Sequence, residues 1–376
     1  MCRALQREDI EVLIATTDAD GPARMPVPLV EELEYQGVRT IFFPASLGER
    51  FNYSPALASW LDSNVRNFDV VHIHAVFSHP CVAAARACRR KDVPYVLRPL
   101  GSLDPWSLRQ KALRKRIMWH IAARRMIKEA AAIHYTTAEE KVLAENSKSL
   151  GNGVVIPLGI EMGVTHNSGP IHDPPFSAGG PYVLALSRIH SKKNLDLLVE
   201  AFLSVTSTRS ELTHWRLVIA GDGDSGYLAS LRAQSERLDG KDRVVFTGWI
   251  EGEEKALVLR GASLFALPSR QENFGIAAAE AMANGVPVVV SKHVNLAPEI
   301  ETVEAGWVTS LVASEFSRTL AEAMSDEEER RRRGAAGKVF AEEQLSWARS
   351  SAELKKLYAS VCERASRNPA HAACRS

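Results

Sequence analysis

Residues 264–290, LFALPSRQENFGIAAAEAMANGVPVVV, decide the fold, because their pattern indicates a strand, a loop, a helix, a turn and a second strand. Gly275 allows the backbone to approach a ligand closely. The amides and the dipole at the start of the following helix favour an anion such as a diphosphate. The segment therefore predicts an anion-binding site at the carboxyl end of a strand.

Two glutamates accompany the start of this helix. Glu272 lies in the loop, and Glu280 lies about a turn and a half inside the helix. Each carboxylate can accept hydrogen bonds from a pair of sugar hydroxyls. The alternative is that both are solvent-facing charges. Phe274 and Gly275 would be costly choices in a free loop, so we favour a role in ligand binding.

The same alternation of strand and helix extends in both directions. It predicts a parallel sheet in each half of the chain, with a boundary near residues 160–180, where proline, glycine and serine become frequent. An amphipathic helix at 350–363 follows Trp347. The predicted strands are 11–17, 39–43, 70–74, 95–98, 132–135 and 153–156, then 182–187, 215–220, 244–247, 264–267 and 286–291.

The composition is that of a soluble globular protein with two domains. The chain has 376 residues, 45% of them hydrophobic and 24% charged. The 46 basic and 45 acidic residues nearly balance, which argues against bulk nucleic-acid binding. Its five cysteines lack zinc or disulfide spacing, so we expect a reducing, cytosolic setting. No run is long and apolar enough to span a bilayer, so any membrane contact should be peripheral.

The amino-terminal region departs from the usual order of a doubly wound domain. Residues 2–7 predict a helix before the strand 11–17, where a strand and a glycine-rich turn are expected first. We therefore expect an empty central position beside strand 11–17. A protein starting at Met1 should be poorly soluble and nearly inactive, and roughly 20 to 30 upstream codons should restore both properties.

Three further motifs occur in order along the second half: LSRIHSKKN at 186–194, AGDG at 220–223 and FTGW at 246–249. Together with residues 264–290 they resemble family 4 of the retaining glycosyltransferases, which have the GT-B fold. The resemblance covers nearly the whole chain and is strongest over 182–291. It implies two Rossmann-like domains facing across a cleft: an acceptor-side domain at 1–165, a nucleotide-sugar domain at 180–345, and a helix at 346–366 that returns to the first domain.

The resemblance also implies roles for individual residues. Arg188 can clamp phosphate oxygens and Lys193 can supply a mobile positive charge, although a lone pair of this kind is usually a surface feature. Asn194 can cap the helix that follows. Glu280 would hold the ribose, and Glu272 the transferred sugar. The catalytic set is Arg188, Lys193 and Glu272, and the donor-binding set is Gly221, Asp222, Gly223, Phe246, Gly248, Asn273, Phe274, Gly275 and Glu280.

Asp222 and Asp224 resemble a metal-binding Asp-x-Asp pair. We prefer a role in the turn, because in this family cationic side chains and helix dipoles stabilise the leaving diphosphate. We therefore expect neither a metal nor another cofactor.

The first half contains candidate residues for the cleft and the acceptor. His72 and His74 share one strand face, but no third metal ligand is evident. His74 lines the cleft or is a structural histidine. Arg98 starts RPLGSLDPW, which resembles a polysaccharide-assembly branch of the family, although Leu100 stands where that branch has arginine.

Residues 105–128 carry eight lysines or arginines and no acidic residue, with apolar residues at helical spacing. This pattern predicts a basic amphipathic helix. It either packs on the core with a solvated basic face or contacts an anionic membrane or a lipid-diphosphate acceptor.

These observations predict a retaining glycosyltransferase of the hexosyltransferase class. It would move a sugar from a nucleotide-diphosphate donor to a glycan or lipid-linked acceptor in cell-surface polysaccharide synthesis, in the cytoplasm or at the inner face of the membrane. The alternatives are a GT-B epimerase or phosphorylase, a catalytically impaired scaffold, and a nucleotide-sugar sensor.

Overall fold

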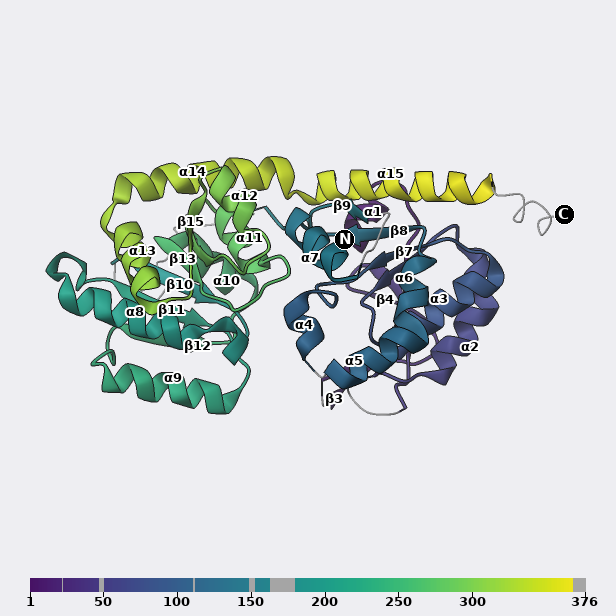
Figure 1. Cartoon of the computed structure of the whole chain (residues 1–376), viewed down its shortest axis with the longest axis horizontal. Helices are drawn as coiled ribbons and strands as arrows, with labels where there is room; N and C mark the ends of the chain where they lie inside the picture. Colours follow the sequence, from purple (N-terminus) through teal and green to yellow (C-terminus); the bar gives the residue numbers. More distant parts are fainter. Residues whose placement is uncertain (22, 47–50, 111, 149–152, 163–179, 368–376) are drawn as a thin grey trace. The chain divides into compact units, whose positions relative to one another are not determined.

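The computed structural model describes residues 1–376 except 22, 47–50, 111, 149–152, 163–179 and 368–376 (Figure 1). The chain divides into two compact units. The first unit contains Met1–Gly159 together with Trp347–Ser376, and the second contains Ile160–Ser346. Both are α/β units with parallel sheets, which confirms the predicted fold class.

The second unit is built on a parallel sheet whose strand order in the described chain is β12-β11-β10-β13-β14-β15. This is the order of a Rossmann fold. The strands are β10 (Tyr182–Leu186), β11 (Arg216–Ala220), β12 (Val244–Gly248), β13 (Leu264–Leu267), β14 (Val288–Ser291) and β15 (Gly306–Thr309). The helices are η3 (Ser191–Lys193), α8 (Leu195–Thr208), η4 (Ser210–Leu212), α9 (Ser225–Arg237), α10 (Gly252–Gly261), α11 (Ile276–Ala283), α12 (Ala297–Thr302), α13 (Ala313–Ser325) and α14 (Glu327–Gln344).

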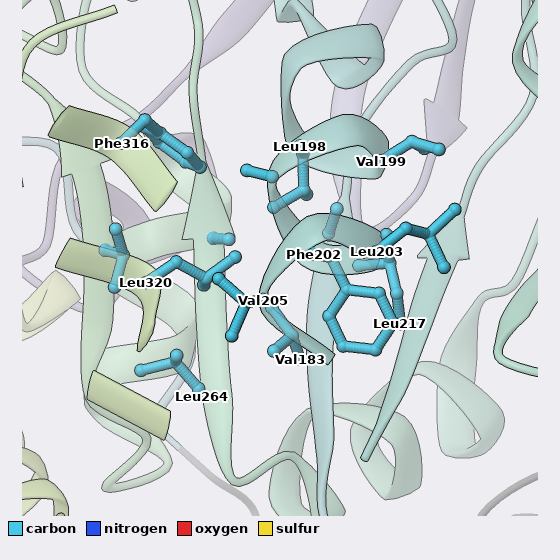
Figure 2. Close-up of a cluster of buried hydrophobic side chains, with 14 of the residues drawn as sticks. Val183, Leu198, Val199, Phe202, Leu203, Val205, Leu217, Leu264, Phe316 and Leu320 are labelled. Atoms are coloured by element: carbon cyan, nitrogen blue, oxygen red, sulfur yellow. The ribbon is translucent and has the colours of Figure 1, made fainter. Parts of the chain in front are cut away.

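The core of the second unit lies between this sheet and two helices. Phe202 of α8 and Phe316 of α13 are fully buried against the strands, as Figure 2 shows. They pack near Val183 of β10, Leu217 of β11 and Leu264 of β13. Helix α11 contacts β13 and β14. Because helices cover the sheet, its central strands are nearly continuous apolar runs.

The described residues of the first unit form two larger sheets and one small two-stranded sheet. In one, β1 (Leu13–Thr17) pairs in parallel with β5 (Val38–Phe43), which pairs antiparallel with β4 (Glu32–Tyr35). The other is parallel and has the order β6-β7-β8-β9, formed by β6 (Val71–His74), β7 (Tyr95–Arg98), β8 (Ala132–Tyr135) and β9 (Gly153–Val155). Strands β2 (Ala19–Asp20) and β3 (Ala23–Arg24) form a hairpin. Among the described residues β1 pairs with β5 alone, so the expected unpaired edge beside strand 11–17 is present.

The helices of the first unit include the last helix of the chain. Helix α15 packs against α1 and the sheet residues Val96 and Ala132. No helix in the described part of the chain is both long and apolar enough to cross a membrane. The remaining helices are α1 (Cys2–Gln6), α2 (Pro55–Asn64), η1 (Val65–Asn67), α3 (His79–Lys91), α4 (Pro105–Arg109), α5 (Ala112–Met118), η2 (Trp119–Ala123), α6 (Arg124–Lys128), α7 (Ala138–Lys148) and α15 (Trp347–Ser366).

The predicted basic helix over 105–128 is wrong as a single element. Helix α4 ends at Arg109, because the backbone of Gln110 is extended (φ −72°, ψ 122°) and leaves the helical region. The chain then forms α5, a π-helical turn (η2) and α6. The helical periodicity continues on both sides of the break, so apolar spacing alone could not reveal it. Strands β4 and β15 and the β2–β3 hairpin were not predicted from the sequence.

Candidate active site

The candidate active site lies at the carboxyl edge of the sheet in the second unit. From β10 the chain passes to β11 on one side, and after β12 it returns to β13 on the other side of β10. Ligands of such sheets bind outside the strand ends at this reversal, between β10 and β13. Arg188 and Lys193 follow β10, and Glu272 follows β13. Strand order therefore gathers residues that are far apart in the sequence.

Lys193 and Glu272 form an ion pair. The Lys193 ammonium donates to Oε1 of Glu272, and both side chains are largely buried, with exposures of 16% and 15%. The hydroxyl of Ser269 donates to the same oxygen at 3.2 Å. Each charge is therefore shielded from water in part and has a compensating partner of opposite charge. The contact of Ser269 with Glu272 was not predicted from the sequence.

Backbone hydrogen bonds hold the loop that carries Glu272. Its amide donates to the carbonyl of His293 at 3.0 Å, and its carbonyl accepts from the amide of Asn295 at 3.0 Å. The amide of Arg270 donates to the carbonyl of Lys192 at 2.9 Å, so this loop is joined to the turn that follows β10. The two loops are therefore fixed to each other at the candidate site.

The predicted capping role of Asn194 is wrong. Asn194 precedes α8 in the left-handed region (φ 56°), and its side chain makes no capping hydrogen bond. Its Oδ1 instead accepts from the Arg270 guanidinium at 2.6 Å. Asn194 therefore strengthens the joint between the two loops, a contact that only the adjacency of β10 and β13 makes available.

The glycine turn after β11 fits closely against the end of β10. Gly221 has φ 132°, and a Cβ there would lie 1.9 Å from the carbonyl oxygen of Ser187. The Asp222 carboxylate accepts from the amide of Gly223 at 2.7 Å. The Asp224 carboxylate accepts from the amide of Tyr227 at 2.7 Å and caps α9. Both carboxylates thus have local roles in the turn and the cap.

Helix α11 begins at Gly275, which has φ 87°. A left-handed residue at this position turns the chain sharply from the loop into the helix. Phe274 is buried, with 4% exposure, and anchors the turn, while Asn273 is half-buried. The first amides of the helix have no acceptor within it and can bind an anion.

Glu280 has a partner that the sequence did not reveal. The ammonium of Lys255, in α10, donates to Oε1 of Glu280 at 2.7 Å. The Glu280 side chain is 22% exposed and the Lys255 side chain is 33% exposed. The two residues lie on different helices, and no motif links them.

The remaining candidates for donor binding are either exposed to solvent or in contact with the core and the sheet edge. Arg188 is exposed. Phe246 packs against the core, and the Arg232 guanidinium lies 4.9 Å from its ring centroid. Gly248 has φ 78°, and its carbonyl accepts from the amide of Gly221 at 2.7 Å. Phe246 and Gly248 therefore support the edge of the sheet beside the glycine turn.

The histidines of the first unit form a buried cluster. Nδ1 of His72 lies 2.7 Å from the Tyr358 hydroxyl, and the rings of His72 and His74 are 4.5 Å apart. His134 lies 3.4 Å from His72 and hydrogen-bonds the carbonyl of Ile156 at 2.8 Å. No group of three or more potential ligands in the described residues could hold a metal ion.

Burial controls the ionisation of this cluster. It lowers the pKa of His74 to about 3 and that of His134 to about 4, and it lowers the pKa of His72 well below its usual value. The nearby Arg98 guanidinium lowers all three further. Arg98 is itself buried, and its Nε has no hydrogen-bond partner within the described chain. His74 therefore belongs to a buried cluster of neutral histidines, and Arg98 is the buried cation beside that cluster.

We predict that acid destabilises the first unit through these histidines. In the unfolded chain they titrate near pH 6.5. Between that pH and their low folded-state values the unfolded state binds more protons, so stability falls as the pH drops from about 6.5 toward 4. Each histidine contributes up to about 1.4 kcal/mol per pH unit. Urea unfolding of wild type and His134→Gln at pH 7 and pH 5 checks this, because the variant should lose less stability. Equal losses would contradict the assignment.

Family models match most of the chain. Residues 1–159 match the glycosyl transferase 4-like domain, and residues 171–340 match glycosyl transferases group 1. A D-inositol 3-phosphate glycosyltransferase of Xylanimonas cellulosilytica is 26% identical over 97% of this chain and 90% of its own length. Mannosylfructose-phosphate synthase of Agrobacterium fabrum is 37% identical over 31% of this chain. That alignment spans 27% of the relative's length.

Solved structures share the fold. Sucrose-phosphate synthase from Thermosynechococcus elongatus superposes with a TM-score of 0.73 and 19% identity, over 96% of this chain and 92% of that one. Anabaena HepE in complex with UDP-glucose gives a TM-score of 0.71 and 17% identity, over 93% and 99%. The two family models, the relatives and the Rossmann-like units agree: the chain belongs to the family-4 type of GT-B glycosyltransferases.

Proposed function

We propose that the chain is a retaining glycosyltransferase that transfers a sugar from a nucleotide-diphosphate donor to a glycan or lipid-linked acceptor in cell-surface polysaccharide synthesis. The Lys193–Glu272 ion pair at the switch point of the sheet carries this proposal. It keeps a cation for the diphosphate and a carboxylate for the sugar side by side. A protein of the same fold, Anabaena HepE, has been solved with UDP-glucose, which supports a nucleotide-sugar donor.

In this proposal donor binding separates the ion pair. Lys193 and Arg188 turn to the diphosphate, together with the first amides of α11, and Glu272 accepts hydrogen bonds from sugar hydroxyls. The bond between the anomeric carbon and the diphosphate oxygen breaks, and the acceptor oxygen attacks from the same face. The acceptor proton passes to the leaving oxygen. The protein contributes positioning and a preorganised field, without a covalent intermediate.

Glu280→Ala should weaken donor binding. The ribose hydroxyls would lose a charged acceptor, at a cost of about 1.5 to 3 kcal/mol, and Lys255 would lose its partner. Isothermal calorimetry with the preferred nucleotide diphosphate measures this. Because Lys255 pairs with Glu280, Lys255→Ala is the matched control: it should cost less, since the carboxylate remains. Unchanged affinity in Glu280→Ala would eliminate the ribose assignment.

The activity itself is tested with purified protein and a panel of nucleotide sugars. Mass spectrometry of bound ligands selects the donor, and release of nucleotide diphosphate that depends on acceptor demonstrates transfer. Proton NMR of the product should show the anomeric configuration of the donor. We propose that no metal is needed, so EDTA should leave the rate unchanged. An inverted product, loss of activity with rescue by Mn²⁺, or diphosphate release without acceptor would overturn the respective part of the proposal.

A surface of the first unit supports contact with an anionic membrane. Three exposed apolar side chains lie four positions apart on α5 and η2. They are Leu113 (75% exposed), Ile117 (51%) and Ile121 (73%). Exposed Arg116 and Arg124 flank them. An apolar stripe beside basic side chains is the pattern of an interfacial helix.

Vesicle sedimentation tests this membrane contact. Binding to vesicles of phosphatidylglycerol should exceed binding to phosphatidylcholine and weaken with salt. The variant in which Leu113, Ile117 and Ile121 are all replaced by serine should have an affinity for these vesicles that is lower by a factor of about ten or more. Val339→Ser removes a 52% exposed valine elsewhere and serves as control. Equal binding of all forms would exclude this surface as the membrane contact.

A further inference from the structure

The first unit contains a cavity of about 690 Å³ between its two larger sheets. Every residue of β1 and every residue of β6 lines it. Strand β1 is paired on its other side with β5, and β6 with β7. Within the described chain no strand pairs with the edges that face the cavity. Two rows of backbone amides and carbonyls therefore border the same cavity.

Helices cover this cavity on both sides, as they cover a sheet. On one side Leu57 and Leu61 of α2 and Cys81 and Ala84 of α3 line it, and these belong to the core that also contains Ile73 of β6. On the other side lie Leu5 of α1 and Tyr358 of α15, which belong to the second core cluster of this unit. The cavity thus has the position of one layer of sheet between two layers of helix.

The surrounding strands define what would fit. Val12 and Val70, just before β1 and β6, pack in the same cluster, so the two strands begin at the same end of the cavity. A strand between them that connects to β1 through a helix would run parallel to both. Strand β1 has five residues, about 16 Å at 3.3 Å per residue. Because helices cover both faces, the fitting strand would be about five mainly apolar residues.

The burial of the edge strands agrees with a missing neighbour. Four of the five residues of β1 are only partly buried, whereas all four residues of β7 are buried. Both strands are covered by helices, so cover does not explain the difference. Unpaired strand edges are also templates for unwanted pairing with other chains.

We propose that this cavity is a binding slot for one extended, mainly apolar strand, supplied in cis by residues that precede Met1 in a longer form of the chain. Met1 and Cys2 line the slot, so a segment that precedes Met1 in the chain would end beside it. A right-handed crossover from the slot strand to β1 needs a helix that spans the strand length, about 11 residues at 1.5 Å each. Helix α1 supplies five of these. A short turn and about six further helical residues complete the connection.

The test compares two forms made with the same cleavable solubility tag: residues 1–376, and the same chain extended by roughly 20 to 30 in-frame upstream codons. Hydrogen exchange with mass spectrometry reads the amides of β1 and β6. The extension should slow their exchange about 100-fold or more and raise the Tm. The matched control carries proline at two alternate positions of the added strand, because proline cannot donate to a ladder. It should not protect.

Several outcomes would overturn the proposal. An upstream stop codon, an upstream sequence without a short apolar run, or an extension that leaves the exchange unchanged would each exclude a strand supplied in cis. Protection in 1–376 that rises with protein concentration would assign the slot to a second copy of the chain. If the extended form fails to fold, a synthetic peptide of the upstream strand added to 1–376 gives the same readout. The exchange readout is independent of glycosyl transfer, so failure of the proposed function leaves this test intact.

Discussion

Lys193→Ala should lower the turnover number by about 100-fold to 1000-fold while changing donor affinity much less. In the proposed mechanism the negative charge on the diphosphate oxygen grows as the glycosidic bond breaks, so a cation beside it would stabilise the transition state more than the bound donor. Removing the ammonium also leaves Glu272 with the Ser269 hydroxyl in place of an ion pair. Steady-state kinetics together with calorimetry of donor binding separates the two effects.

Lys192→Ala is the matched control for this substitution. It removes the neighbouring positive charge and retains the backbone carbonyl that accepts from Arg270. This variant should keep most of its turnover. If Lys193→Ala lost donor affinity and turnover by the same factor, Lys193 would serve binding alone. If Lys192→Ala were equally damaged, the effect would be one of general charge in the turn.

Gly221→Ala should destabilise the second unit by at least about 3 kcal/mol. A Cβ at this position would lie 1.9 Å from the Ser187 carbonyl oxygen, and φ 132° is a region that residues with a side chain rarely adopt. Relief requires the ends of β10 and β11 to separate. That movement would also displace Arg188 and the turn that carries Lys193, so donor binding should be lost together with stability.

Gly252→Ala is the control that separates the steric clash of a new Cβ from the cost of a positive φ in a residue with a side chain. Gly252 also has a positive φ, 56°, but a Cβ there meets nothing within 4 Å. It should cost only about 1 kcal/mol. Urea unfolding followed by circular dichroism measures both variants. Similar losses for the two would mean that the close approach of Gly221 to Ser187 is relaxed without cost.

The sequence by itself predicted the α/β class of the second unit and five of its six described strands, all but β15. Apolar runs such as YVLAL at β10 indicate strands buried on both faces, and the loop around Gly275 indicates a strand-to-helix turn. These are local features, because backbone periodicity and positive φ depend on a few neighbouring residues. The same local pattern at 105–128 did not reveal the break at Gln110. In the first unit, the helix before strand 11–17 was enough to predict an unpaired edge.

The tertiary structure alone decided which of these residues meet. Glu272 lies 79 positions after Lys193, and they pair because β10 and β13 are neighbours in the sheet. Lys255 reaches Glu280 from a different helix, and Asn194 binds Arg270 in place of capping α8. The slot between β1 and β6 has its volume and lining from helices at opposite ends of the chain. Strand order and helix packing determine which charged side chains pair and which strand edges stay unpaired. The spacing of residues along one segment determines neither strand order nor packing.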